Sequence, residues 1–245
     1  MNVEFYGKQY NRRRAWEVID VAPKQNVKPG SERTLSKALA LSQLELPVGE
    51  WIGQELIKNV TLHPGIIQLL KANQQDEIKH DQALGKLRSS FTVRAEDDET
   101  VSDMVRVANT LSVTFSPLIL AGVLEVSIFF VVLPMYRFLG GGGFRTVAND
   151  ISNDENIHVA TNLQLARDLG YNRGNTLDRF RESIIDWLTE DLTSDNKDKY
   201  LNRDFWITTS HNLYHSGKAP QLQATKRAVM PSFFEKDNRN LPKYG

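Results

Sequence analysis

Apolar residues recur at three- and four-residue intervals along most of the chain, and strictly alternating polar and apolar runs are scarce. This spacing is the helical period, because positions three and four apart lie on one face of a helix. Proline and glycine divide the pattern into segments. We expect helices over residues 31–59, 64–90, 101–111, 117–139, 144–169, 176–192 and 198–215. The sequence therefore predicts an all-α protein.

Residues that start or stop helices set these boundaries. Pro47 interrupts the apolar pattern of the first segment, so we expect a kink there. Pro64 suits the first position of the second helix. The acidic stretch 95–100 fits a loop and a helix start, where negative charge is favourable. Residues 140–143 are four glycines and are not expected to be helical, and Gly170 fits a helix C-cap.

The chain has 245 residues, a length at which one domain is the default. We predict an N-terminal arm over 1–30, a helical bundle over 31–215, and an extended tail over 216–245, which is polar and contains prolines. The formal net charge is zero, which argues against a general electrostatic grip on nucleic acid. There are no cysteines, so disulfides, zinc–thiolate sites and cysteine nucleophiles are excluded. The polar N-terminus shows no signal peptide, and we expect a cytoplasmic protein.

One stretch, residues 118–135, is almost wholly apolar and about long enough to span a bilayer. Glu125 lies inside it. A carboxylate at bilayer depth is costly, so we favour a helix buried on all sides over a membrane span.

The motif Asp-Glu-x-x-His occurs twice, at 76–80 and at 154–158. In a helix, the glutamate and the histidine of each copy lie on one face. Carboxylate and imidazole together suit Fe, Mn or Zn better than Mg or Ca. A single copy is usually a solvated surface pair. Two copies, which contain two of the chain's five histidines, favour a metal site.

Two lone glutamates complete a pattern with these motifs. Glu45 lies 32 residues before Glu77, and Glu125 lies 30 residues before Glu155. Such spacing places two positions at similar heights on adjacent antiparallel helices. One glutamate from each of two helices and a Glu-x-x-His from each of two others is the ligand pattern of dimetal carboxylate bundles. Glu125 supports this reading, because a carboxylate in an apolar run needs a cation or a metal. Glu50 is the alternative to Glu45.

We predict two metal ions per chain, held by Glu45, Glu77, His80, Glu125, Glu155 and His158. A metal-bound histidine usually donates its second N–H to a carboxylate. We therefore expect Asp76 and Asp154 each to hold the histidine of the opposite motif, with a surface aspartate as the alternative. Leu84, Phe129 and Phe130 could line an apolar pocket, with ordinary core packing as the alternative.

This ligand pattern resembles the ferritin-like di-iron carboxylate superfamily, and within it most closely the small subunits of ribonucleotide reductase. Residues 124–136 resemble the helix of those proteins that bears a ligand glutamate, and residues 153–158 resemble their last ligand motif. Residues 233–236, followed by Tyr244, resemble their C-terminal segments. The resemblance covers roughly residues 35–169.

The resemblance implies a ferritin-like four-helix bundle with additional helices, and a dimetal oxidoreductase that activates O₂. Fe/Fe is the first expectation, with Mn/Fe and Mn/Mn as alternatives. It also implies a homodimer, with an electron donor of unknown identity and a large reductase subunit as partners. The zero net charge and the position of Glu125 argue against nucleic acid and membrane as partners.

This chain also departs from the pattern of those proteins. It is much shorter, and Leu84 stands where most of them carry a radical-forming tyrosine. A radical stored on tyrosine at that site is therefore excluded. Tyr136 and Trp16 are candidates for electron transfer, with simple aromatic packing as the alternative for each.

Other functions are left open by the sequence. The chain could be an oxidase or hydroxylase for a small organic substrate, a non-catalytic iron store, or a partner-binding bundle. A ferritin-like store should assemble into a large cage, so the molar mass in solution distinguishes it. His211 and His215 have a metal-compatible spacing, with a helix-face pair as the alternative.

Overall fold

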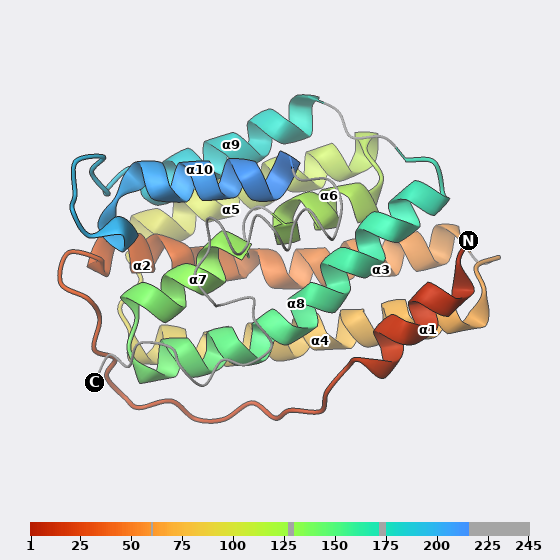
Figure 1. Ribbon diagram of the computed structural model, residues 1–245, viewed down its shortest axis with the longest axis horizontal. Coiled ribbons are helices and arrows are strands. Elements are labelled where there is room, and N and C mark those ends of the chain that lie inside the picture. Colours follow the sequence, from red (N-terminus) through yellow and green to blue (C-terminus); the bar gives the residue numbers. More distant parts are fainter. Residues whose placement is uncertain (60, 127–129, 172–174, 216–245) are drawn as a thin grey trace.

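The computed structural model describes residues 1–59, 61–126, 130–171 and 175–215. Within these ranges every regular element is a helix, and β-bridges occur only as isolated pairs, Val27 with Gly140 and Thr193 with Asn202. Figure 1 shows the helices stacked side by side, most of them along the long axis of the molecule. The prediction of an all-α protein is confirmed.

The α-helices are α1 (Val3–Asn11), α2 (Glu32–Ala40), α3 (Glu45–Lys58), α4 (Pro64–Ser90), α5 (Ala95–Thr114), α6 (Pro117–Leu124), α7 (Phe130–Leu139), α8 (Gly142–Asp168), α9 (Asn175–Thr189) and α10 (Arg203–His215). Short 3₁₀ turns occupy Leu41–Leu44 and Lys199–Leu201.

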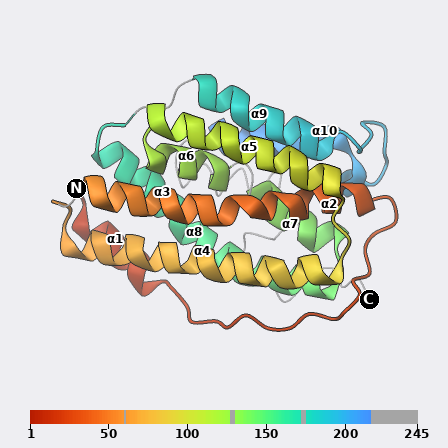
Figure 2. The same cartoon turned by 180° about the vertical axis from the view of Figure 1, so that it is seen from behind.

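The centre of the molecule is formed by α3, α4, α6 and α8. α3 packs against α4 and α6, and α8 packs against the same two helices. α7 continues the contact with α8, while α9 pairs with α10. Both views show α1 and α4 near one edge and α9 and α10 near the opposite edge (Figures 1 and 2). The apolar core lies between these layers and includes fully buried leucines from the central helices.

The first predicted helix is interrupted earlier than expected. It forms α2 and α3, joined by the 3₁₀ turn at 41–44, whereas the kink was expected at Pro47. Pro47 lies in the first turn of α3, where the lack of an N–H costs no helical hydrogen bond. A proline ring crowds the carbonyl four residues earlier, which here belongs to Gln43. The change from the 3₁₀ turn to the α-helix therefore falls before the proline rather than at it. As a result, Glu45 is the first residue of α3.

The apolar stretch is described as α6 and α7, with 127–129 outside the described residues. All residues of α6 are buried, as the sequence predicts. Glu125 and Val126 continue α6 in a wider π-helical turn, a form that is common at functional sites. Within the described ranges, no helix combines the length and the apolar content needed to cross a membrane.

The glycine run 140–143 does not behave entirely as predicted. α8 begins at Gly142 rather than near Phe144, so two of the four glycines are helical. The N–H of Gly143 donates to Oε1 of Gln25 at 2.9 Å. The first N–H groups of a helix have no partner within the helix, and glycines have no side chain that could cap them. A side chain from the N-terminal arm therefore accepts a hydrogen bond from one of these N–H groups.

The end of α8 follows the expected pattern. Gly170 has a φ of +74°, a conformation that glycine adopts without strain. Its N–H donates to the carbonyl of Arg167 at 3.0 Å, and the N–H of Tyr171 donates to the carbonyl of Ala166 at 2.8 Å. This pair of bonds closes the helix in a Schellman motif, so the C-cap prediction is confirmed.

Other helix ends also differ from the predicted ones, and α5 extends beyond the predicted range 101–111 at both ends. α5 begins at Ala95, so the acidic residues form its first turn, where they face the positive end of the helix dipole. α9 ends at Thr189, three residues before the predicted end. α10 begins at Arg203, because Asp198 instead caps the short 3₁₀ turn with a bond from the N–H of Tyr200 at 3.0 Å.

The segment predicted as an N-terminal arm contains a helix that the sequence analysis did not identify. α1 packs against α4 and α8, and Tyr6 is buried there with its hydroxyl donating to Asp168 at 2.8 Å. The chain then runs along the outside of the molecule to α2 (Figure 1). The predicted tail, 216–245, lies outside the described residues.

Candidate metal centre

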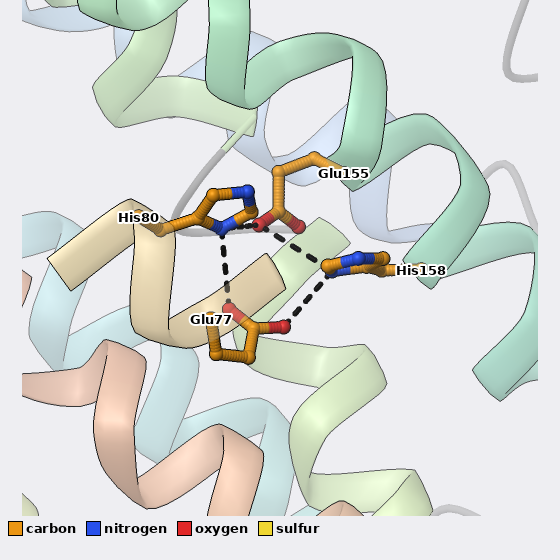
Figure 3. Close-up of side chains that lie close together, drawn as sticks. All are labelled: Glu77, His80, Glu155 and His158. Atoms are coloured by element: carbon orange, nitrogen blue, oxygen red, sulfur yellow. Dashed lines mark ion pairs between the residues drawn. The ribbon is translucent and has the colours of Figure 1, made fainter. Parts of the chain in front are cut away.

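Four side chains from the two motifs meet inside the molecule. Glu77 and His80 come from α4, and Glu155 and His158 come from α8. All four are buried, and each offers a ligand atom within 4.8 Å of the others. Figure 3 shows the two carboxylates placed between the two imidazoles.

Each of these carboxylates contacts both imidazoles. Nδ1 of His80 lies 3.2 Å from Oε2 of Glu77 and 3.2 Å from Oε1 of Glu155. Nδ1 of His158 lies 2.9 Å from Oε1 of Glu77 and 3.8 Å from Oε1 of Glu155. Glu77 and Glu155 therefore both lie within reach of the two imidazoles.

The aspartate of each motif faces the histidine of the other. Nε2 of His80 lies 3.4 Å from Oδ2 of Asp154, and Nε2 of His158 lies 3.5 Å from Oδ2 of Asp76. The structure thus places the aspartates as the sequence analysis expects. Because Nε2 of each ring faces an aspartate, Nδ1 is the atom left to face the cluster.

Glu45 lies beside the four clustered side chains. It is fully buried, and its Oε2 is 3.5 Å from Nδ1 of His80. Glu50, the alternative ligand, is exposed, so the structure favours Glu45. Gly49 allows α3 to come this close, because a Cβ there would lie 3.3 Å from Cβ of Glu77.

Glu125 is fully buried, as its apolar surroundings predict, but it is not within the group of four. Both of its carboxylate oxygens accept bonds from Nδ2 of Asn162, at 2.9 and 3.0 Å. Asn162 lies on α8 one turn beyond His158, so it holds Glu125 next to that end of the cluster. The sequence analysis did not identify Asn162.

Burial and mutual repulsion determine the charge of the carboxylates. Burial raises the pKa of Glu45 and Glu125 well above the ordinary value, and it raises the pKa of Glu155 as well. Burial also opposes ionisation of Glu77, but the neighbouring imidazoles of His158 and His80 together outweigh it and lower the pKa of Glu77. Glu77 is therefore the carboxylate of this set that ionises most readily, whereas burial favours the protonated form of Glu45, Glu125 and Glu155.

The imidazoles respond in the opposite sense. Burial disfavours their charged form, but the surrounding carboxylates outweigh it and raise the pKa of both His80 and His158 well above the ordinary value. Asp154 contributes most to the rise at His80, and Glu77 contributes most at His158. A cluster of this kind needs positive charge, which protons or metal ions can supply.

Ligand atoms that lack a hydrogen-bond partner converge at the same place. They are both carboxylate oxygens of Glu45, Glu77 and Glu155, and Nδ1 of His80 and His158. Buried polar atoms without a partner are costly and rare. Carboxylate oxygen and imidazole nitrogen are ligands of iron, manganese and zinc. The residues present therefore fit a metal centre.

The N-terminal arm supplies two residues that hold the aspartates. Nη2 of Arg13 donates to both oxygens of Asp76 at 2.7 Å, and Nε1 of Trp16 donates to Oδ2 of Asp154 at 2.6 Å. No sequence motif marks Arg13, and Trp16 was expected to act in electron transfer or in aromatic packing. The arm shows no helical periodicity around these positions that could have placed them against α4 and α8.

The other predicted residues lie as follows. Leu84 is buried one turn beyond His80, with a relative exposure of 2%. Tyr136 is buried, and its hydroxyl donates to the carbonyl of Ala38 at 2.7 Å. His211 is exposed on α10, away from the cluster residues.

Some predicted positions are not placed by the structure. Phe129 lies outside the described residues, as do the side chains of Phe130 and His215. The proposed pocket is therefore represented by Leu84 alone among the described side chains.

The chain matches no protein-family model, no curated protein and no solved structure. What the site does is therefore inferred from its own residues.

Proposed function

We propose that this chain is a dimetal-carboxylate oxidoreductase of the ferritin-like kind, which activates O₂ at a di-iron or Mn/Fe centre and resembles the small subunits of ribonucleotide reductase. The observation that best supports this is the convergence of unpaired ligand atoms from both Asp-Glu-x-x-His motifs. α3, α4, α6 and α8, which pack around the cluster, would be the four helices of the bundle.

Charge balance favours two divalent ions. The buried glutamates of the predicted ligand set are Glu45, Glu77, Glu125 and Glu155. When ionised they carry four negative charges, and imidazoles that bind metal are neutral. Two divalent cations balance that charge, whereas with one cation two of the carboxylates would have to stay protonated and could not serve fully as ligands.

The bridging ligands would be Glu77 and Glu155. Each lies against Nδ1 of both His80 and His158. The two ring centroids are 5.5 Å apart, so the imidazoles sit on either side of the carboxylates. One ion would therefore be bound at each imidazole, and we call these the His80 position and the His158 position.

The remaining glutamates would complete the two positions. Glu45 would bind at the His80 position, because its carboxylate lies beside that imidazole. Glu125 would bind at the His158 position, on the side where Asn162 holds it. The hydrogen bonds from Asn162 would fix the orientation of Glu125 and leave its remaining lone pairs for metal.

Two reduced ions bound in this way supply the electrons with which O₂ is activated. The residues of the chain exclude water, as the burial of Leu84 beside His80 illustrates. They also offer a route for electrons from the surface, because Trp16 donates to Asp154, which faces His80. We propose Trp16 as the first residue of that route.

The proposal is tested by metal analysis of protein expressed with iron and manganese available, and by optical spectra of the ferrous protein before and after O₂ is added. We expect about two ions per chain and a new absorption band on oxygenation. Less than about half an ion per chain after reconstitution would contradict the proposal. A molar mass of a large cage would instead indicate iron storage.

A matched pair of variants makes this test specific. Glu77→Gln preserves the size of the side chain but removes a charge and a bridging ligand. We expect it to lower the bound metal to one ion per chain or fewer and to abolish the O₂-dependent absorption. Glu50→Gln makes the same chemical change at an exposed position of α3 and should retain both properties. Full metal content in Glu77→Gln would argue against a bridging role.

A further inference from the structure

The two aspartates behind the histidines are equally buried but have different partners. Asp76 and Asp154 are each 2% exposed. Asp76 accepts two bonds from Arg13 at 2.7 Å, and Nζ of Lys79 lies 3.4 Å from its Oδ1. For Asp154, the bond from outside the cluster comes from the indole N–H of Trp16, at 2.6 Å. One aspartate is thus paired with positive charge, and the other with a neutral donor.

This difference between the two aspartates should change how strongly the histidines that they face bind metal. A carboxylate that accepts the N–H of a ligating histidine makes that imidazole a stronger donor. A guanidinium bound to both oxygens of the carboxylate offsets its charge and draws electron density away from the histidine. The indole N–H of Trp16 is a neutral donor, so it draws less electron density away from Asp154 and from the histidine that Asp154 faces. His80, backed by Asp154, should therefore be a stronger ligand than His158, backed by Asp76.

From these contacts we propose that Arg13 and Trp16 are positioning residues that make the two metal positions unequal, with the ion at the His80 position held more tightly than the ion at the His158 position. The inference rests on the proposed dimetal centre. Each metal position would have the same types of ligand, namely one histidine, one lone glutamate and the two bridging carboxylates. Ligand type alone therefore does not decide which position fills first, and the inference supplies that order.

Both positioning residues come from one short piece of chain. Arg13 and Trp16 lie just beyond α1, which is fixed to α8 by the bond from Tyr6 to Asp168 at 2.8 Å. Arg13 is also held by the carbonyl of Ala72 on α4, at 3.2 Å. The arm therefore reaches both aspartates from the same side of the molecule, so its sequence sets the difference between the two positions.

The test is a titration of the metal-free full-length chain with Zn²⁺. Calorimetry measures the affinity of each binding step, and NMR of the protein labelled with ¹⁵N-histidine shows which imidazole binds the ion. The chain has five histidines, and variants at His80 and His158 assign their signals. We expect two stepwise affinities, with the first equivalent of Zn²⁺ shifting the Nδ1 signal of His80 and the second shifting that of His158.

Three variants separate charge from structure. Arg13→Gln removes the compensating charge from Asp76, so the affinity at the His158 position should rise about tenfold and the two affinities should converge. Arg13→Lys keeps the charge and should retain most of the original difference. Trp16→Phe removes a hydrogen-bond donor from Asp154, so His80 should become an even stronger ligand. The difference in affinity between the His80 and His158 positions should therefore widen.

The opposite signs expected for Arg13→Gln and Trp16→Phe are the decisive result. A purely structural role would loosen the arm in both variants and weaken both positions together, which would overturn the inference. Binding of the first equivalent at His158 would also overturn it. Failure of the wild-type chain to bind two ions would instead contradict the proposed dimetal centre. Circular dichroism of each metal-free variant shows whether it is folded.

Discussion

At the scale of single residues, the cluster concentrates acidic side chains where solvent cannot stabilise their charge. Each of the six predicted ligands is at most 1% exposed. An ionised carboxylate in such a place must be paired, protonated or bound to a cation. The raised pKa of Glu45 and the raised pKa of His80 both favour protonation at this place when no cation is bound.

This protonation predicts opposite pH dependences for the metal-free and the metal-loaded protein. The pKa of Glu45 and Glu125 is raised from 4.5, and that of His80 and His158 from 6.5, so the folded state binds more protons than the unfolded state. The free energy of unfolding of the metal-free protein should therefore fall as pH rises above 4.5, and further above 6.5, until the folded pKa values are passed. The lowered pKa of Asp76 acts in the other direction, but only below its ordinary value of 3.8.

Metal reverses the trend because ions displace these protons and so bind more tightly as pH rises. The stabilisation by Zn²⁺ or Mn²⁺ should therefore grow between roughly pH 5 and pH 8. Urea unfolding at a series of pH values, with a chelator and with metal, measures both curves. Parallel curves would show that the buried groups do not exchange protons for metal.

At the scale of secondary-structure elements, the site depends on how closely α3 approaches α4. Gly49 on α3 lies against Glu77, and a Cβ at that position would be 3.3 Å from Cβ of Glu77. That separation is tighter than an ordinary van der Waals contact, so a side chain at position 49 would move the glutamate or part the helices. The glycine thus sets the position of a predicted bridging ligand.

Gly49→Ala should therefore weaken metal binding, with the larger loss in the ion that dissociates first. Gly85→Ala is the matched control, because Gly85 is exposed in α4 and a Cβ there meets no atom within 4 Å. Alanine is the better helix former, so the control should stabilise the protein by up to about 1 kcal/mol and leave the metal affinity unchanged. Calorimetric titration and thermal unfolding give the two quantities. Equal metal affinities in the two variants would show that the close approach at Gly49 is not needed.

At the scale of the whole molecule, the predicted ligands lie between Glu45 and His158, and the arm completes the shell around them. α9 and α10 pack together on the side away from α1 and α4 (Figure 2). α10 ends at His215, where the predicted tail begins. The ligands, the aspartates and the residues that hold them all lie within the described helices and the arm.

A chain ending after His215 should therefore retain its helix content and both metal ions. Elemental analysis and circular dichroism of the truncated protein test this prediction. Loss of metal on truncation would show that residues 216–245 contribute to the site. If metal and the O₂-dependent absorption persist but activity with a large reductase partner is lost, the tail would be a docking segment, which would favour the reading as a small subunit of a reductase.

The sequence predicts several features of this protein because they depend on local spacing. A separation of three positions between a glutamate and a histidine places both on one helix face, and this holds for Glu77 with His80 and for Glu155 with His158. The run of apolar residues around Glu125 correctly predicts its burial. The proline before α4 and the glycine after α8 mark helix ends through their backbone conformations alone.

Only the tertiary structure decides the features that depend on which faces meet. It favours Glu45 over Glu50, because the turn at 41–44 sets the rotation of α3. It places Glu125 on Asn162, and it brings the arm residues Arg13 and Trp16 to the aspartates. Arg13 and Asp76 are 63 positions apart, and Trp16 and Asp154 are 138 apart. Helical periodicity fixes the face on which a side chain lies, whereas the packing of distant segments fixes the side chain that it meets.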